Sequence, residues 1–207
     1  MKKPSFERIL DMQQLLFAFT EIDRLIHFPD SKRIDRRENN AEHSFSLAVM
    51  AWFLSQYYPI LKKHRLIQYA LVHDLVEVYA GDEQAVGRTK AAEKAKKERE
   101  HKAYLRLKKE WTDFPDMLEH IEGYETKKDN EAKFIYALDK LMPLLLNMLS
   151  EGKTWRKYRF TQNDVMTSKD TKVTISPEIN ELWQKIRPEV LNSGFFHNQE
   201  VNLEQRS

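Results

Sequence analysis

Residues 70–82 constrain the fold of this chain more than any other stretch, because ionisable side chains interrupt an apolar run there. The stretch reads Ala-Leu-Val-His-Asp-Leu-Val-Glu-Val-Tyr-Ala-Gly-Asp. On a helix, Glu77 lies one turn beyond His73 and Asp74 and on their side. Burying such groups without a partner costs free energy. A metal ion is the simplest partner, so the stretch predicts a helix that carries part of a metal site.

The remaining chain has the pattern of an α-helical protein. Only five glycines occur in 207 residues, and the long segments repeat apolar residues with helical periodicity. Helices are expected over residues 5–26, 40–58, 63–79, 88–110, 115–124, 129–152 and 176–191, whereas 153–175 are expected to be irregular and the tail after Gly194 loosely held. We therefore predict an all-α bundle of about six to eight helices.

Composition limits the domain count and the function classes. A chain of 207 residues with 41% hydrophobic residues suffices for one buried core, so we expect a single domain over residues 1–207. The 34 basic and 32 acidic residues leave a charge of +2, too near balance for a general polyanion binder. Cysteine is absent, which excludes disulfides and thiolate ligands and suits a reducing compartment. With no apolar run of about 18 residues and an amphipathic N-terminus, a cytoplasmic location without membrane contact is expected.

The segment from Arg88 to Glu110 differs in composition, with ten Lys or Arg against four Glu. It predicts a long solvated helix, and the alternative is a helix whose positive field draws anionic substrates toward a nearby pocket. Nucleic-acid binding is poorly supported, because few aromatic residues alternate with the charges.

Four side chains are candidate metal ligands, namely His43, His73, Asp74 and Asp139. Two imidazoles and two carboxylates suit Mn²⁺, Co²⁺, Fe²⁺, Zn²⁺ or Mg²⁺. Taken singly, His43 also fits a structural or exposed histidine, and Asp139 with Lys140 fits a surface ion pair. The adjacent His73 and Asp74 are harder to explain without a metal, because apolar residues flank them on both sides.

Three spaced blocks resemble the HD-domain superfamily of metal-dependent phosphohydrolases, and within it the YfbR-like 5′-deoxynucleotidase branch. They are Glu42-His43-Ser44 with Glu38-Asn39 before it, the ungapped series His73, Asp74, Glu77 and Asp82, and Asp139 with Glu131 eight residues earlier. The similarity spans about residues 5–151, which leaves 153–207 as a C-terminal extension. It implies a single divalent ion held by the four candidate ligands.

The resemblance also implies an activity, which is the release of phosphate from deoxynucleoside 5′-monophosphates. Glu77 would orient or deprotonate the attacking water, and Asp82 would assist by holding that water or a sugar hydroxyl. The alternative for Glu77 is a carboxylate that orients His73. The family forms homodimers, so a homodimer is expected for this chain too.

Substrate-binding residues are suggested by the same resemblance. Arg24 best matches the family's phosphate-holding arginine, with Arg36 and Arg37 as competitors, and Arg88 falls where relatives carry a lysine near the substrate. Relatives often place a tryptophan against the deoxyribose where this chain has Leu25. That departure leaves sugar discrimination and substrate size open.

Three alternative functions remain open at this point. The same site would accept a deoxynucleoside triphosphate if Arg33, Arg36 and Arg37 bound the additional phosphates. A two-metal phosphodiesterase or oxygenase would need further histidines, and the surroundings of His101 and His120 look solvated. A non-catalytic helical interaction module would not require Glu77 and Asp82. The sequence names neither the native metal nor the preferred base.

Overall fold

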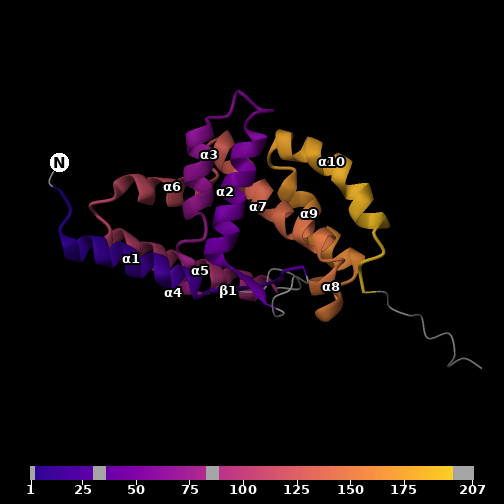
Figure 1. Ribbon diagram of the computed structural model, residues 1–207, viewed down its shortest axis with the longest axis horizontal. Helices are drawn as coiled ribbons and strands as arrows, with labels where there is room; N and C mark the ends of the chain where they lie inside the picture. The colour runs from indigo at the N-terminus through magenta and orange to yellow at the C-terminus, as the bar shows by residue number, and fades with distance from the viewer. Residues whose placement is uncertain (1–2, 30–35, 83–88, 198–207) are drawn as a thin grey trace, which may run out of the picture.

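The computed structural model describes residues 3–29, 36–82 and 89–197, which form helices and one two-stranded ribbon (Figure 1). The all-α class is confirmed, and the described helices other than the short α4 and α8 match the six to eight expected. None of the helices in these ranges is long and apolar enough to cross a membrane. The helix bounds are α1 Phe6–Thr20, α2 Asn40–Leu54, α3 Lys63–Val72, α4 Glu77–Ala80, α5 Lys90–Glu110, α6 Pro115–Thr126, α7 Asn130–Leu149, α8 Lys153–Lys157, α9 Gln162–Val173 and α10 Pro177–Asn192.

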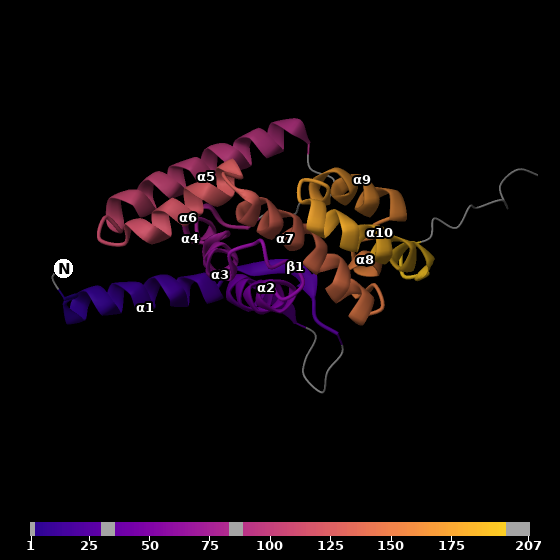
Figure 2. The same cartoon turned by 90° about the horizontal axis from the view of Figure 1, so that it is seen from above.

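The hydrophobic core has two parts that meet near the polar stretch. One part joins α2, α3 and α7 to α9 and α10, and the other joins α1, α5 and α6. Figures 1 and 2 show α1, α5 and α6 toward one end, α8 to α10 toward the other, and α2, α3 and α7 between them. Tyr69 and Ala70 belong to the first part, whereas Leu75 and Val76 belong to the second. His73 and Asp74 therefore lie at the junction of the two parts.

The helix predicted over residues 63–79 is interrupted, so that prediction was wrong in detail. The His73 ring donates from Nδ1 to the Ala70 carbonyl at 2.9 Å, and this is the carbonyl that Asp74 N–H would bond in a continuous α-helix. The next turn is closed by Glu77 N–H donating to Asp74 O at 2.9 Å, three residues back. Residues three apart eclipse in such a turn, which points Asp74 and Glu77 the same way.

The first helix ends at Thr20, whereas the sequence predicted residue 26. Strand β1, Asp23–His27, follows it and pairs antiparallel with β2, Arg37–Asn39. Ile22 and Ile26 keep helical spacing, so the periodicity did not reveal the strand. Pairing with β2 outweighs that local preference. Because Arg24 belongs to β1, its side chain reaches Asp74 and donates a hydrogen bond to it.

Residues 153–175 are helical, contrary to the prediction of an irregular segment, since they form α8 and α9. Thr161 begins α9 with a capping box, in which its hydroxyl accepts from Asp164 N–H at 3.2 Å. The tail also packs further than expected, because Phe196 is buried and stacks on Trp155 with ring centroids 4.4 Å apart. The rest of the tail, from residue 198, lies outside the described residues.

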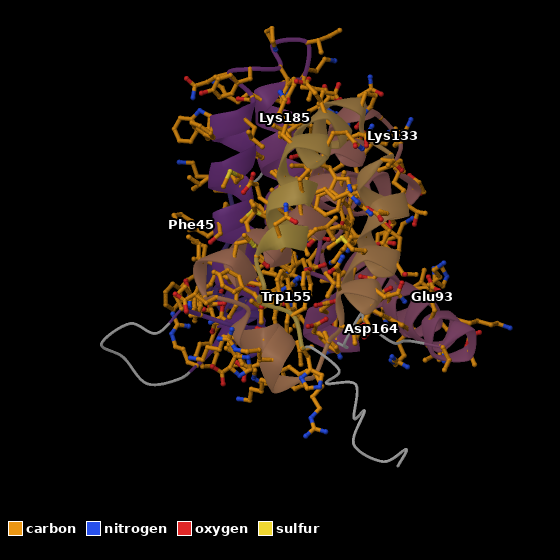
Figure 3. The ribbon with its side chains drawn as sticks, turned by 90° about the vertical axis from the view of Figure 1, so that its right-hand side faces the viewer. Phe45, Glu93, Lys133, Trp155, Asp164 and Lys185 are labelled. Atoms are coloured by element: carbon orange, nitrogen blue, oxygen red, sulfur yellow. The ribbon has the colours of Figure 1, made fainter. Side chains whose placement is uncertain are left out.

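One face of α2 exposes large apolar side chains. Phe45, Trp52 and Phe53 are 67%, 55% and 51% exposed, and Figure 3 shows Phe45 at the outer side of that helix. On α1, Phe6 and Phe17 are 69% and 62% exposed. Large exposed apolar patches on a folded domain mark interaction surfaces.

Gly123 lets α6 approach α3, and this contact gives a testable prediction. A Cβ at Gly123 would lie 2.6 Å from the Tyr69 hydroxyl, which donates to Asp129 at 3.0 Å and accepts from Arg65 at 2.8 Å. We expect Gly123→Ala to lower the free energy of unfolding by about 1–3 kcal/mol through overpacking, although alanine alone favours a helix interior by about 1 kcal/mol.

Urea unfolding monitored by circular dichroism measures this change. In a Tyr69→Phe background the clashing oxygen is absent, so the loss caused by Gly123→Ala should be smaller there. A Gly123→Ala protein at least as stable as the parent would contradict the packing argument.

Candidate metal centre

The four predicted ligands come together in the folded chain. His43 comes from α2, His73 and Asp74 from the end of α3, and Asp139 from α7, and one ligand atom of each lies within 4.8 Å of the others. His43 is 1% exposed and Asp139 is 2% exposed. An exposed histidine and a surface ion pair are therefore excluded as explanations. Within the described ranges, no other group of three or more acidic residues and histidines is arranged this way.

His73 is oriented so that a lone pair faces two carboxylates. Because the Ala70 carbonyl can only accept, Nδ1 of His73 carries the hydrogen and Nε2 of the neutral ring carries none. This Nε2 is buried without a hydrogen-bond partner, 3.0 Å from Asp74 Oδ2 and 3.8 Å from Asp139 Oδ1. Lone pairs directed at one another repel, so these three atoms fit a shared cation. Burial opposes a charged ring, but the nearby Asp74 and Asp139 outweigh it and raise the pKa of His73.

His43 is held between two carboxylates. Its Nε2 lies 3.0 Å from Asp139 Oδ1, and its Nδ1 lies 3.3 Å from Glu38 Oε2. A carboxylate behind a ligating imidazole fixes the ring orientation and raises its basicity. Glu38 belongs to β2 and is 4% exposed. The sequence motif Glu38-Asn39 drew attention to Glu38. Its contact with His43 could not be predicted, because it depends on the pairing of β2 with β1.

Asp139 stays ionised although it is buried. Its Oδ2 accepts from Lys140 Nζ at 2.5 Å and from the Tyr124 hydroxyl at 3.2 Å. Burial alone would raise the pKa of Asp139, but Lys140 and the two histidines hold it well below its usual range. Asp139 therefore offers Oδ1 to the ligand cluster while Oδ2 is held by its neighbours.

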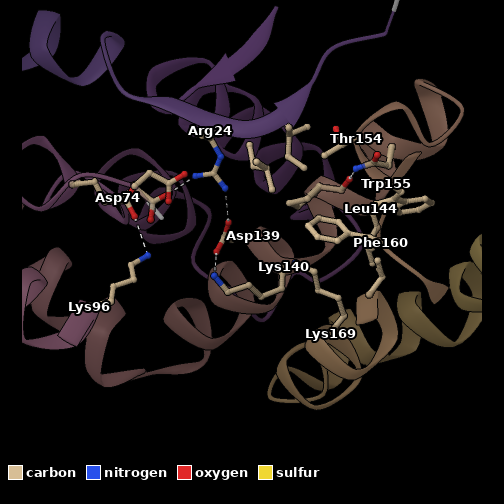
Figure 4. A pocket seen from close by; sticks show the side chains of 17 residues that line it. Arg24, Asp74, Lys96, Asp139, Lys140, Leu144, Thr154, Trp155, Phe160 and Lys169 are labelled. Carbon is tan, nitrogen blue, oxygen red and sulfur yellow. Dashed lines mark hydrogen bonds and ion pairs between the residues drawn. The ribbon is translucent and has the colours of Figure 1, made fainter. Parts of the chain in front are cut away.

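Arg24 is the fixed positive charge beside the ligands. Its guanidinium lies 2.7 Å from Asp74 Oδ2, 3.4 Å from Glu38 Oε2 and 3.9 Å from Asp139 Oδ1, and Figure 4 shows it above Asp74 and Asp139. Burial opposes the charge on Arg24, yet the surrounding carboxylates raise its pKa. Burial likewise opposes ionisation of Asp74, but His73 and Arg24 hold the pKa of Asp74 well below its usual range.

A pocket opens onto this cluster (Figure 4). The cavity of this pocket has a volume of about 130 Å³. Arg24, Asp74 and Asp139 lie at one end, together with Glu77 and Asp82. Figure 4 shows the far end lined from α7, α8 and α9 and the turn between the last two, by Leu144, Thr154, Trp155, Phe160 and Lys169. Asn147 and Val165 line the same pocket.

Glu77 lines the pocket as a buried carboxylate, with 3% exposure. Its Oε2 accepts from Asn40 Nδ2 at 2.8 Å and its Oε1 accepts from Lys96 Nζ at 3.2 Å. Burial and the neighbouring Asp74 and Asp82 raise the pKa of Glu77 to about 8. Neither of its side-chain contacts reaches His73, so the alternative of a carboxylate that orients His73 has no contact to support it.

Of the predicted arginines other than Arg24, the two that the structure describes, Arg36 and Arg37, do not line the pocket. Arg37 is 42% exposed at its side chain and donates to Asp23 at 2.7 Å on the surface. Arg36 donates to Glu42 at 2.7 Å and lies over the Phe28 ring. Arg88, like Arg33, lies outside the described residues.

Three lysines line the pocket that sequence reasoning did not assign, namely Lys96, Lys140 and Lys169. Lys96 belongs to the lysine-rich helix α5, so that helix is not only a solvated face. Lys140 carried a signal in the sequence because it adjoins Asp139. Lys169 lies in the segment predicted to be irregular, where no sequence pattern placed it at a site.

His101 and His120 do not extend the cluster. His120 is buried, contrary to the solvated surroundings expected, and its Nδ1 donates to Asp116 O at 2.7 Å while its ring packs against Tyr69. His101 is exposed on α5. The described residues therefore provide no second set of ligands for a two-metal site.

A helical domain with two histidines and two aspartates buried at a pocket defines the class of this protein. A family model described as HD domain matches residues 29–183. The chain belongs to this HD domain family.

Curated proteins named 5′-deoxynucleotidase are similar to about half of this chain. The 5′-deoxynucleotidase HDDC2 of Homo sapiens is 30% identical over 120 residues, and that of Xenopus laevis is 32% identical over 117 residues. The chain spans about half the length of these curated relatives, 55% and 56%.

Solved structures match a larger share of this chain than the curated relatives do. A predicted metal-dependent phosphohydrolase from Magnetospirillum magnetotacticum MS-1 has a TM-score of 0.74 and 28% identity, covering 92% of this chain and 99% of that one. An HD-domain phosphohydrolase from Listeria innocua has a TM-score of 0.62 over 88% of this chain and 89% of its own. At 18% identity, this second structure supports the fold alone.

The ligand cluster predicts stabilisation by a divalent cation. Adding Mn²⁺ or Co²⁺ at a hundred times its dissociation constant should stabilise the folded chain by about 2.7 kcal/mol, which raises the melting temperature. His73→Ala should remove most of this shift, because it deletes the unpaired Nε2. The control His101→Ala removes an exposed histidine and should keep the full shift. An equal shift in His73→Ala and the parent would contradict the assignment.

Proposed function

We propose that this chain is a metal-dependent phosphohydrolase that releases phosphate from deoxynucleoside 5′-monophosphates. The observation that carries this proposal is the largely buried cluster of His43, His73, Asp74 and Asp139 beside a pocket that is also lined by Glu77. The similarity to proteins named 5′-deoxynucleotidase supports the substrate class.

The four residues of the cluster would hold one divalent ion, of the Mn, Co, Zn, Fe or Mg kind that such a donor set accepts. When bound, that ion supplies Lewis acidity, which acidifies water and withdraws charge from phosphoryl oxygens. Arg24 and Lys140 bring further positive charge to the same end of the pocket. When a dianionic phosphate enters this end of the pocket, contacts with these cations replace its hydrating water.

Glu77 acts as the general base in this proposal. Burial and the neighbouring carboxylates raise the pKa of Glu77, so its ionised form is a stronger base than an ordinary glutamate. Asn40 and Lys96 each hold one of its oxygens, so the carboxylate is oriented before substrate arrives. Asp82 lines the same pocket and would hold the attacking water or a sugar hydroxyl.

Leu25 and Ile26 line the pocket beside Arg24 as an apolar wall. This wall suits a deoxyribose, which lacks the 2′-hydroxyl. A deoxynucleoside triphosphate remains the second candidate, favoured by the additional cation Lys96 at the pocket. The surface positions of Arg36 and Arg37 give it no further support.

The activity test uses Mn²⁺- or Co²⁺-loaded protein with dAMP and with dATP, resolving phosphate, pyrophosphate and triphosphate. We expect phosphate from dAMP. Glu77→Ala should retain metal binding and lose about a hundredfold or more in kcat, as for loss of a general base. Asp139→Ala should lose the metal and some stability together, and Glu93→Ala on the exposed face of α5 serves as the control.

Full activity in Glu77→Ala would refute the role of that residue. Triphosphate released from dATP without turnover of dAMP would favour the second candidate. No release from any nucleotide by the metal-loaded protein would favour the non-catalytic interaction module.

We also infer that two copies of the chain form a homodimer through the apolar faces of α1 and α2. The exposed side chains of Phe45 and Trp52 share one face of α2 and lie away from the pocket lining. Burying such a face contributes roughly 25 cal/mol for each Å² of apolar surface. Phe45→Glu with Trp52→Glu should convert a dimer into a monomer in light scattering while phosphatase activity per chain is kept. A parent protein that is monomeric at high concentration would refute this interface.

A further inference from the structure

The far end of the pocket carries polar groups that the proposed hydrolysis does not use. Figure 4 shows Thr154 and Trp155 of α8 and Lys169 of α9 at the end opposite Arg24 and Asp74, and Asn147 of α7 lines the same pocket two turns along that helix from Asp139. Trp155 and Phe160 provide aromatic surface there. The region is therefore an apolar niche with a few polar side chains, which is the usual composition of a specific small-molecule site.

The Lys169 side chain is largely buried, and its amine has no partner among the described residues. It is 7% exposed, and none of the described residues accepts a hydrogen bond from it or pairs with it. Burial and the nearby Lys140 charge lower the pKa of Lys169 to about 7. Leaving a buried donor unpaired costs free energy, which a ligand with an acceptor atom would recover.

Asn147 presents an unpaired acceptor in the same niche. Its Nδ2 donates to the Pro143 carbonyl at 2.9 Å, which fixes the orientation of the amide. Its Oδ1 is buried and has no hydrogen-bond partner, and the residue is 0% exposed. The niche thus offers one free acceptor and one free donor.

The free acceptor of Asn147 and the free donor of Lys169 distinguish between two possible occupants of the niche, a phosphate and a nucleobase. A phosphate presents only acceptors at neutral pH, so the Oδ1 of Asn147 would repel it. A nucleobase edge presents an N–H beside a carbonyl or ring nitrogen, and its flat rings pack on aromatic side chains. The occupant that satisfies both Asn147 and Lys169 is therefore a heterocycle.

We propose that Asn147 and Lys169 form the nucleobase subsite of this pocket, with Asn147 Oδ1 accepting from a base N–H and Lys169 Nζ donating to a neighbouring base acceptor. This proposal rests on the proposed nucleotide phosphohydrolase function. It makes Lys169 and Asn147 specificity-determining residues that act on the base and not on the phosphate.

The experiment separates the base from the phosphate by using each alone. Lys169→Met and Asn147→Leu are compared with Lys172→Met, the same substitution at a partly exposed lysine of α9 outside the pocket lining. Calorimetry measures binding of the four deoxynucleosides, which lack phosphate, to the metal-free proteins. Kinetics measure kcat/KM for the deoxynucleoside monophosphates and for 2-deoxyribose 5-phosphate, which lacks a base.

We expect Lys169→Met and Asn147→Leu each to lower nucleoside affinity and nucleotide kcat/KM about tenfold, the usual effect of losing one buried hydrogen bond. Turnover of 2-deoxyribose 5-phosphate should be unchanged, and Lys172→Met should resemble the parent in every assay. Lys169→Met should also melt at a higher temperature than the parent, because it removes an unpaired buried amine.

Other outcomes overturn the proposal. An equal loss for nucleotides and 2-deoxyribose 5-phosphate would assign Lys169 to phosphate, and a lower melting temperature would assign it to folding. Nucleoside binding that is absent from the parent, or unchanged in both variants, would remove the subsite. A parent that binds nucleosides through Lys169 but releases no phosphate would refute the proposed hydrolysis and support the subsite.

Discussion

The hydrogen bond from His73 to the Ala70 carbonyl is the interaction on which the centre depends. It takes the carbonyl that would have continued α3, and the chain then turns with tighter winding up to Glu77. It also fixes the hydrogen of the imidazole on Nδ1, which leaves Nε2 facing Asp74 and Asp139. One contact thus ends a helix, sets a tautomer and directs two carboxylates toward the same pocket.

The concentration of negative charge at this turn is balanced by cations from distant parts of the chain. Arg24 comes from the ribbon, Lys96 from α5 and Lys140 from α7, and they pair with Asp74, Glu77 and Asp139 respectively. Because these groups are largely buried, each unpaired charge would be costly, and the pairings hold the three elements at fixed positions. The electrostatic balance of the site is therefore also part of the tertiary structure.

The sequence allowed the residues of the ligand cluster to be predicted, whereas the surroundings of the pocket were not predicted, for a physical reason. His73, Asp74 and Glu77 are neighbours along the chain, so their relation follows from local geometry. The block around His43 and the one at Asp139 were found by motif. The sequence placed Arg24 in a helix because Ile22 and Ile26 keep helical spacing. The segment is a strand because it pairs with β2, a contact that the local sequence does not reveal. Lys169 carried no pattern at all, since its burial depends on how α9 packs against α7.

The two ends of the pocket are supported by different stretches of sequence. The aromatic walls of the far end are held from behind by residues 195–197, through the stack of Phe196 on Trp155 and the hydrogen bond from His197 N–H to Phe160 O at 3.1 Å. None of these contacts involves a metal ligand. Changes in this late segment can therefore reshape the part of the pocket farthest from the ligands while the reactive centre is preserved. In evolutionary terms, a protein built this way can acquire a new substrate without rebuilding its chemistry.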